Sequence, residues 1–247
     1  MFGSKNYLFS FFLVLSVLSC DSEDSPNIDV ITLSSVLLDR ESVPDNVIAC
    51  AASNEDSKTV SVFLYPREGA TNISYYETES LDLDKNDFSL YTKRTGNLID
   101  VFNGYLLKYE ITPEQEKWLI VTFEEEGKIH LSNPIRLKQN SKPTEYLPEN
   151  IMVQPKGTMP AFTWVDGMFK DSKIYFHVVS NENDDLLSGT YTFDKFFQYY
   201  KLDNVVLNIT EEEPPTLEIG PNYNFTLLAV SEDNWVNLFS IVPFHIP

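Results

Sequence analysis

The dominant pattern along this chain is a succession of short apolar runs in which hydrophobic and polar residues alternate, bounded by Gly, Pro, Asn and Asp. This pattern predicts β-strands rather than helices. The clearest runs are 59–65, 72–76, 117–123 and 128–131. The last two flank residues 124–127, a loop of hairpin length in which Gly127 can take a positive φ. A β-hairpin is therefore expected there.

Helical periodicity is scarce, because no long stretch repeats apolar residues every 3 to 4 positions. Residues 112–116 alone predict a helical turn, with Thr112 as the cap and Pro113 at the first helical position. The length of the chain predicts about two domains of roughly 100 residues each.

The boundary between these two domains is expected at residues 139–144, a polar stretch that includes Pro143. Apolar, strand-like sequence stands on both sides of this linker. We therefore expect one β-sandwich at 28–138 and a second at 145–247.

The N-terminal residues 1–19 have the order of a signal peptide. A short polar start with one charge at Lys5 precedes an apolar run over 7–18, and a small residue stands before Cys20. The apolar run is too short to span a bilayer as a helix, which takes about 20 residues. The competing interpretation, an N-terminal core strand, fits poorly with the acidic stretch over 21–26. We expect residues 1–19 to be absent from the mature protein.

The residues Val17-Leu18-Ser19-Cys20 resemble the lipobox of bacterial lipoproteins. The resemblance implies that Cys20 becomes the N-terminus and carries a lipid that anchors the chain to a membrane, and several acyl chains anchor more firmly than one. The acidic run that follows resembles the surface-export signal of Bacteroidota lipoproteins, so residues 20–27 are interpreted as an acidic tether. The implied location is the outer membrane, with the chain exposed at the cell surface.

The chain is strongly acidic, with a formal net charge of -19 at pH 7. Such a surface repels phosphate backbones, so nucleic acid is not an expected partner. A lipidated Cys20 leaves Cys50 with no cysteine to pair with. Because Cys50 lies in the apolar stretch 47–52, we expect a small buried residue in a strand rather than a nucleophile.

The most specific fold signal lies between Leu217 and Val230. Leu217 stands six residues before Tyr223, and alternating apolar residues follow, which resembles the fibronectin type III pattern. In that family the tyrosine forms a corner, in which its hydroxyl bonds back to upstream backbone while the ring packs in the core. Residues 162–164 resemble strand B with its core tryptophan, and residues 174–178 resemble strand C.

This resemblance covers 145–247, although the segment 186–200 is longer and more aromatic than the usual connection between strands C and E. The first domain has no matching Leu and Tyr pair, so its immunoglobulin-like assignment rests on analogy. The expected fold class is all-β: two tandem immunoglobulin/fibronectin III-like antiparallel β-sandwiches after a signal peptide. This architecture hosts adhesion, assembly and ligand binding, and the fold alone does not assign a function.

Motifs of catalysis are missing: the sequence has no Gly-x-Ser-x-Gly elbow, no His-Glu-x-x-His, no Gly-rich phosphate loop and no Cys-x-x-Cys. The three histidines, His130, His177 and His245, are isolated and are expected to be structural. Paired carboxylates arise by chance in so acidic a chain, so they do not indicate a glycosidase. We expect no enzyme, no catalytic residue and no cofactor.

Alternating oxygen ligands at Asp82, Asp84 and Asn86 are how a calcium loop begins. An EF-hand would need Gly at the sixth place and Glu at the twelfth, where this chain has Asp87 and Lys93. The motif therefore fails, and a looser calcium site remains the weak alternative here and at 181–185. The favoured interpretation is a solvated turn whose side chains bond to their own backbone.

An aromatic cluster in the segment 186–200 is the candidate ligand site. Aromatic rings on a β surface can stack on sugar rings while neighbouring polar groups bond the hydroxyls. The alternative is that these rings pack into the core. The candidate ligand-binding residues are Tyr191, Phe193, Tyr199 and Tyr200, and Phe196 and Phe197 are less favoured because they lack a hydroxyl.

Two functional hypotheses follow. The first is a non-catalytic cell-surface lipoprotein that acts as a protein-interaction or adhesion module, with a flat surface or a free sheet edge for its protein partner. The second is a glycan-binding accessory lipoprotein of a polysaccharide-uptake system, which requires exposed aromatics that converge on a groove. A hydrolase with carboxylates in a cleft is the minor third. The exposure of residues 191–200 distinguishes the first two.

Overall fold

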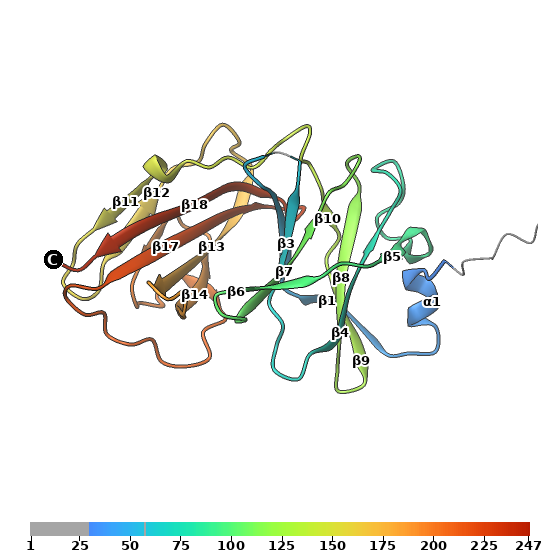
Figure 1. Cartoon of the computed structure of the whole chain (residues 1–247), viewed down its shortest axis with the longest axis horizontal. Helices are drawn as coiled ribbons and strands as arrows, with labels where there is room; N and C mark the ends of the chain where they lie inside the picture. Colours follow the sequence, from blue (N-terminus) through green and yellow to red (C-terminus); the bar gives the residue numbers. More distant parts are fainter. Residues whose placement is uncertain (1–29, 57) are drawn as a thin grey trace, which may run out of the picture.

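The computed structural model describes residues 30–56 and 58–247 (Figure 1). The predicted signal peptide at 1–19, the lipid-bearing Cys20 and the acidic tether to residue 27 lie outside these residues. Within the described part of the chain, no helix is long and apolar enough to cross a membrane. The described chain is all-β, as the alternating pattern predicted.

The first half of the chain forms two facing sheets, which we call the first sandwich. One sheet has the order β1-β9-β8-β4-β5, with β10 paired to β8, and the other has the order β2-β3-β7-β6. All pairs are antiparallel except β1 with β9. In chain order the elements are α1 (Leu33–Leu37), β1 (Ser42–Val47), β2 (Ala49–Ser53), β3 (Val60–Leu64), β4 (Thr71–Glu77), η1 (Phe88–Leu90), β5 (Thr92–Arg94), β6 (Leu98–Val101), β7 (Leu106–Ile111), β8 (Trp118–Glu125), β9 (Lys128–Ser132) and β10 (Ile135–Arg136).

The hairpin predicted at 124–127 is present between β8 and β9. Its two loop residues both have a positive φ, 51° at Glu126 and 79° at Gly127. Such a pair gives the loop the twist that antiparallel strands need. Glycine meets this requirement without strain, because it has no Cβ.

The helical turn predicted at 112–116 is wrong, since this segment is an irregular connection from β7 to β8. Its side chains bond to neighbouring loops instead: the Gln115 amide donates to the Glu79 carbonyl (2.5 Å), and the Glu116 carboxylate accepts the Ser141 N–H (2.6 Å). The one described α-helix, α1, begins where no helix was predicted. Thr32 and Ser35 cap it reciprocally, and buried Leu33 attaches it to the first sandwich.

The second half of the chain forms the second sandwich, from a three-stranded sheet β11-β12-β15 and a five-stranded sheet β16-β14-β13-β17-β18. Every strand pair in it is antiparallel. Its elements are η2 (Pro148–Asn150), β11 (Ile151–Gln154), β12 (Ala161–Trp164), β13 (Ser172–Asn181), β14 (Leu186–Thr192), β15 (Phe196–Gln198), β16 (Val205–Asn208), β17 (Asn222–Ser231) and β18 (Val236–His245).

The fibronectin-like features of the second sandwich are confirmed. Buried Trp164 lies on β12, and β13 occupies the place of strand C. Leu217 and Tyr223 are both buried in the core, and the Tyr223 hydroxyl accepts the Glu218 backbone N–H at 2.9 Å. The tyrosine therefore ties the turn before β17 to the core. The long segment 186–200 holds β14 and β15, which lie in different sheets.

The four sheets are stacked in sequence, so that three apolar layers separate them (Figure 1). One layer is the core of the first sandwich and another is the core of the second. The third lies between the sandwiches, where the β2-β3-β7-β6 sheet faces the five-stranded sheet. Beyond the first sandwich, α1 and η1 cover the outer face of the β1-β9-β8-β4-β5 sheet.

Trp235, at the turn between β17 and β18, joins the two sandwiches most closely. Although the turn belongs to the second sandwich, the Trp235 side chain is fully buried in the core cluster of the first. Its indole N–H donates to the Lys142 carbonyl at 2.8 Å. The Ala51 N–H of β2 donates to the neighbouring Asn234 carbonyl at 3.0 Å. The first core is thus completed by a residue from the second half of the chain.

The segment between the sandwiches is held on both sides. The Thr144 N–H donates to the Ser53 hydroxyl (2.8 Å), and the Ser53 N–H donates to the Thr144 hydroxyl (3.0 Å). The Thr144 hydroxyl also donates to the Val236 carbonyl at 2.8 Å. The Tyr146 hydroxyl donates to the Ser53 carbonyl at 2.8 Å. These bonds fix how the second sandwich sits on the first.

Candidate functional site

The four aromatic residues predicted as a ligand site lie in different surroundings. Tyr199 is only 2% exposed, and its hydroxyl donates to the Pro215 carbonyl at 2.6 Å in the core of the second sandwich. Phe193 is 64% exposed, in the turn between β14 and β15. The half-buried Tyr200 accepts a hydrogen bond from the Asn208 amide at 2.7 Å, and Tyr191 faces the first sandwich. These residues do not converge on one groove.

The calcium candidates Asp82, Asp84 and Asn86 are exposed. The Asp84 carboxylate accepts the Asn86 N–H at 2.9 Å, which is the local bond of a solvated turn. In the second candidate loop, the Asn181 side chain accepts the Asp185 N–H at 3.0 Å in the same manner. Among residues 30–56 and 58–247, no group of three or more His, Cys, Asp and Glu residues is placed to hold a metal ion.

The histidines occupy three unrelated sites. His177 is fully buried in the second sandwich, where it shares a 2.8 Å hydrogen bond with Thr190 and packs on Phe197 at 4.2 Å between ring centroids. Burial lowers the pKa of His177 to about 3, so the ring stays neutral at ordinary pH. His130 shares a 2.7 Å hydrogen bond with Asn46, and His245 is exposed near the C-terminus.

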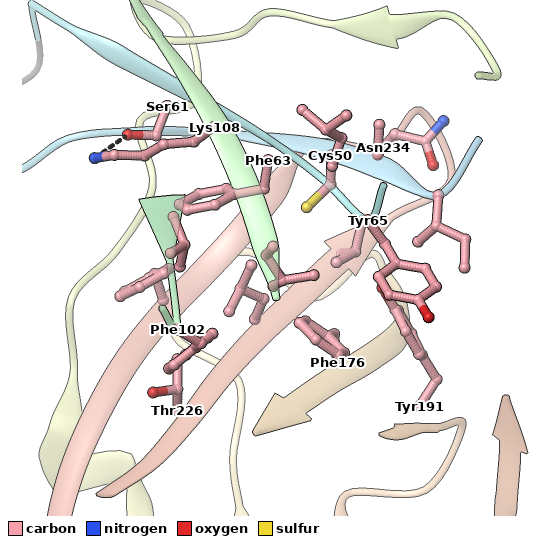
Figure 2. Close-up of a pocket in the computed structure, with 18 of the residues that line it drawn as sticks. Cys50, Ser61, Phe63, Tyr65, Phe102, Lys108, Phe176, Tyr191, Thr226 and Asn234 are labelled. Carbon is pink, nitrogen blue, oxygen red and sulfur yellow. Dashed lines mark hydrogen bonds between the residues drawn. The ribbon is translucent and has the colours of Figure 1, made fainter. Parts of the chain in front are cut away.

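A cavity of about 890 Å³ lies between the two sandwiches, and we call it the interdomain cavity. One wall is the outer face of the β2-β3-β7-β6 sheet, and the other is the outer face of the five-stranded sheet. Figure 2 shows side chains from both walls pointing into it. The bulky apolar residues of its walls include Phe63, Phe102, Phe176, Tyr191, Leu228 and Phe239.

The wall that the second sandwich gives to the cavity comes from strands that are buried on both faces. Residues 175–180 of β13 and 225–231 of β17 are buried without a break. Alternate side chains point to opposite faces of a strand, so a continuous buried run requires cover on both faces. Tyr175 and Phe225 belong to the core of the second sandwich, whereas Phe176 belongs to the layer between the sandwiches.

Aromatic pairs stiffen the walls of the cavity. Phe176 stacks on Tyr191 within the second sandwich, with ring centroids 4.5 Å apart. Phe63 of the first sandwich stacks on Phe239 of the second at 6.1 Å. Pairs of this kind contribute about 0.5–1.5 kcal/mol beyond the area they bury. The apolar walls are therefore formed before any ligand arrives.

Cys50 is a free cysteine on β2, and its sulfur faces the interdomain cavity (Figure 2). The Cys50 side chain is partly exposed, and its exposed part faces the cavity. Burial raises the pKa of the Cys50 thiol to about 12, because the thiolate is poorly solvated there. Cys50 therefore acts as a small apolar residue of the cavity wall, and its thiol is not an activated nucleophile.

Two basic residues line the cavity. Arg67 is fully engaged, because it pairs with the Glu125 carboxylate at 2.6 Å and donates to the Asn46 side chain at 2.8 Å. Lys108 is held more loosely, with its ammonium 3.4 Å from the Ser61 hydroxyl and 3.3 Å from the Glu110 carboxylate. The Lys108 ammonium is therefore the basic group on the cavity wall that has room for another partner.

Sequence reasoning placed the candidate site in the segment 186–200, and of that segment Tyr191 lines the cavity. The remaining lining residues were missed, because they are distant in sequence and meet only when the two sandwiches pack together. One signal was available: β13 and β17 carry apolar residues at both odd and even positions, which indicates strands covered on both faces.

Comparisons with known proteins give little beyond this geometry. No protein-family model matches the chain, and no curated protein matches it either. Among solved structures, the chain is similar to the FN1-FN3 domains of chicken CNTN1, with 14% identity, a TM-score of 0.28, and coverage of 84% of this chain and 68% of that one.

Two further solved structures show similar values. The BSP domain of a biofilm associated protein has 14% identity and a TM-score of 0.28, over 81% of this chain and 29% of that one. The chicken interferon gamma receptor alpha chain has 11% identity and a TM-score of 0.27, over 83% of this chain and 100% of that one. Because these TM-scores are low, the fold assignment rests on the strand order of the two sandwiches.

Proposed function

We propose that this chain is a non-catalytic binding module, exported and held at the cell surface by a lipid on Cys20, whose recognition site is the interdomain cavity. The observation that carries the proposal is the cavity itself, about 890 Å³ of space with apolar walls in an interface that is otherwise buried. Binding pockets for small ligands typically have volumes of about 300–1,000 Å³.

The two sandwiches support this role because they are held together before binding. Trp235 completes the first core from the second sandwich, and the reciprocal bonds of Ser53 and Thr144 fix the connection. A site formed in advance loses less conformational entropy when it binds. The walls of the cavity therefore favour recognition without a large rearrangement.

The protein-interaction or adhesion role remains a proposal for the outer surface of the same unit. Two edge strands, β6 and β16, present exposed apolar residues to a partner, with Leu98 at 38% and Val206 at 46% exposure. A strand from another protein can pair with such an edge. Cross-linking on intact cells, followed by purification of this chain, tests for a protein partner. Recovery of the chain alone would leave the cavity as its binding surface.

The glycan-binding alternative gains no support from the segment 186–200. Stacking on a sugar ring needs several exposed rings that share one face, yet Tyr199 and Phe197 are in the core, and of the four candidate residues Phe193 is the exposed one. A panel of oligosaccharides tested against Phe193→Ala checks this point. Saturable binding that the variant loses would restore the glycan hypothesis.

The lipid anchor is tested by feeding cells an alkyne-tagged fatty acid and measuring its incorporation into the chain. The full-length chain should take up the label and fractionate with the outer membrane, and Cys20→Ser should do neither. A labelled Cys20→Ser chain would contradict the proposed anchor site.

The binding role is tested with residues 20–247 carrying Cys20→Ser, so that no attached lipid competes for the cavity. A neutral apolar dye should bind saturably, and it should slow the reaction of Cys50 with methylmercury. If the dye binds without protecting Cys50, the interdomain cavity is not the recognition site.

A further inference from the structure

We infer that the interdomain cavity accepts a small amphiphile with an apolar body and one acidic group, and that the acidic group is held by Lys108. The inference rests on the proposed function, because it names the chemical class of ligand for the same cavity. A long-chain fatty acid is the simplest member of this class.

The apolar residues of the cavity walls favour a ligand with an apolar body. Rings of Phe63, Phe176 and Phe239 line the cavity from both sandwiches, and Cys50 adds an apolar thiol between them. Burial of apolar surface contributes about 25 cal/mol per Å². A ligand made mainly of polar groups would lose its hydration against these walls without compensation.

The acidic group is specified by Lys108. It lies on the central part of β7, opposite Phe63 of β3 and Ile99 of β6, so its ammonium rises from an apolar wall. Its contacts with Ser61 and Glu110 are at 3.3–3.4 Å, longer than a strong charge-assisted bond of about 2.7–2.9 Å. A carboxylate in the cavity can approach this ammonium more closely than either group does.

The net charge of the chain strengthens the assignment. The formal net charge is -19, so an acidic ligand is repelled by most of the surface. Both basic residues of the cavity lie on the first sandwich, and Arg67 is already paired with Glu125. Lys108 therefore gives the cavity one position where a negative charge is favourable, in surroundings that strengthen the attraction.

The orientation of the ligand in the cavity follows from the positions of Lys108, Cys50 and Tyr191. Figure 2 shows Lys108 and Ser61 on one side of the cavity, Cys50 in the middle, and Tyr65 and Tyr191 on the other side. When the acidic group of the ligand is bound at Lys108, its apolar body passes Phe63 and Cys50 and ends near Tyr191. Cys50 then lies beside the bound body, which makes its reactivity a reporter of occupancy.

The test compares palmitate with its neutral methyl ester, on residues 20–247 carrying Cys20→Ser. Affinity is measured by displacement of a neutral dye, and occupancy by protection of Cys50 from methylmercury. Lys108→Met keeps the length of the side chain and removes the charge. Lys93→Met, at the exposed position of β5 in the other sheet of the first sandwich, is the matched control.

We expect Lys108→Met to weaken palmitate binding by tenfold or more, since a hydrogen bond to a charged group contributes about that much. The methyl ester should bind the original chain and Lys108→Met within about twofold of each other. Lys93→Met should leave both ligands unchanged. Protection of Cys50 should accompany binding in every case.

Three other results would overturn the inference. Equal palmitate affinity for the original chain and Lys108→Met, with Cys50 still protected, would refute the role of Lys108 and leave the cavity as a binding site. Palmitate binding without protection of Cys50 would place the ligand elsewhere. No protection of Cys50 by palmitate, by its ester or by the dye would contradict both the inference and the proposed function.

Discussion

Both faces of the five-stranded sheet carry an apolar cluster, but they differ in how completely they are covered. Toward the core of the second sandwich, Phe162 stacks on Phe225 with ring centroids 4.0 Å apart, and Trp164 packs beside them. Toward the first sandwich, Phe176 and Phe239 stand at the wall of a cavity of about 890 Å³. One face is filled by its own chain, and the other leaves space.

The filled face of the sheet contributes to stability, whereas the face at the cavity is the one that we propose for recognition. Filled cores resemble organic crystals in their packing density, so voids of this size are rare in them. A large apolar cavity lowers stability, because its walls lack contacts on one side. Its presence between two firmly joined sandwiches supports the proposal that a ligand fills it.

The largest expected effect is on the free energy of unfolding, and it differs between variants on the two faces of the sheet. Phe162→Ala should lower the free energy of unfolding by about 3–5 kcal/mol, because it empties a filled core. Phe239→Ala should lower it by less than about 2 kcal/mol, because its ring already borders open space. Urea denaturation of both variants measures the difference. Equal losses would show that the two faces are packed alike.

Removing Trp235 tests whether the layer between the sandwiches is fixed. Trp235→Ala should cost about 3 kcal/mol, because it opens the first core and removes the bond to Lys142. Phe193→Ala, at an exposed site, is the control and should change stability by less than about 0.5 kcal/mol. If Trp235→Ala unfolds at the same urea concentration as the original chain, the two sandwiches are not joined through this residue.

His177 makes the filled core sensitive to acid. The folded-state pKa is about 3 and the ordinary value is 6.5, so protonation favours the unfolded chain. The stability present above pH 6.5 is lost as the pH falls toward 3, by about 1.4 kcal/mol per pH unit. His177→Asn should unfold with a weaker dependence on pH between 6.5 and 5. Identical pH profiles would mean that His177 is protonated in the folded protein.

The tyrosine corner gives the smallest of the expected effects on stability. Tyr223→Phe keeps the ring in the core and removes the acceptor of the Glu218 N–H. The variant should lose about 1 kcal/mol in urea denaturation. The half-buried Tyr200 accepts a hydrogen bond from Asn208, and Tyr200→Phe should lose less. A larger loss in Tyr200→Phe than in Tyr223→Phe would reverse the assignment of the corner.

Much of the fold could be predicted from local sequence. Alternation revealed β3, β4, β8 and β9, and the spacing of Leu217 and Tyr223 revealed the second sandwich. Short elements were less predictable. The five-residue helix α1 depends on a Thr32 and Ser35 cap, which resembles an ordinary polar turn in sequence.

The candidate site was less predictable than the fold. The aromatics at 191–200 belong to strands of two different sheets, so Tyr191 on β14 reaches the cavity while Phe197 on β15 and Tyr199 just after it fill the core. The sequence gives no sign of Lys108 as a site residue, because a lysine in a strand is ordinary and its place on the cavity wall depends on how two distant sheets meet. No local sequence pattern predicts how the two sheets meet.

The most direct test of the cavity as a binding site is anomalous diffraction from crystals grown with a fatty acid that carries bromine at its apolar end. We expect a bromine peak inside the interdomain cavity, near Tyr191, with the carboxylate at the Lys108 ammonium. A bromine peak only on the outer surface, with the cavity holding no ligand, would contradict it.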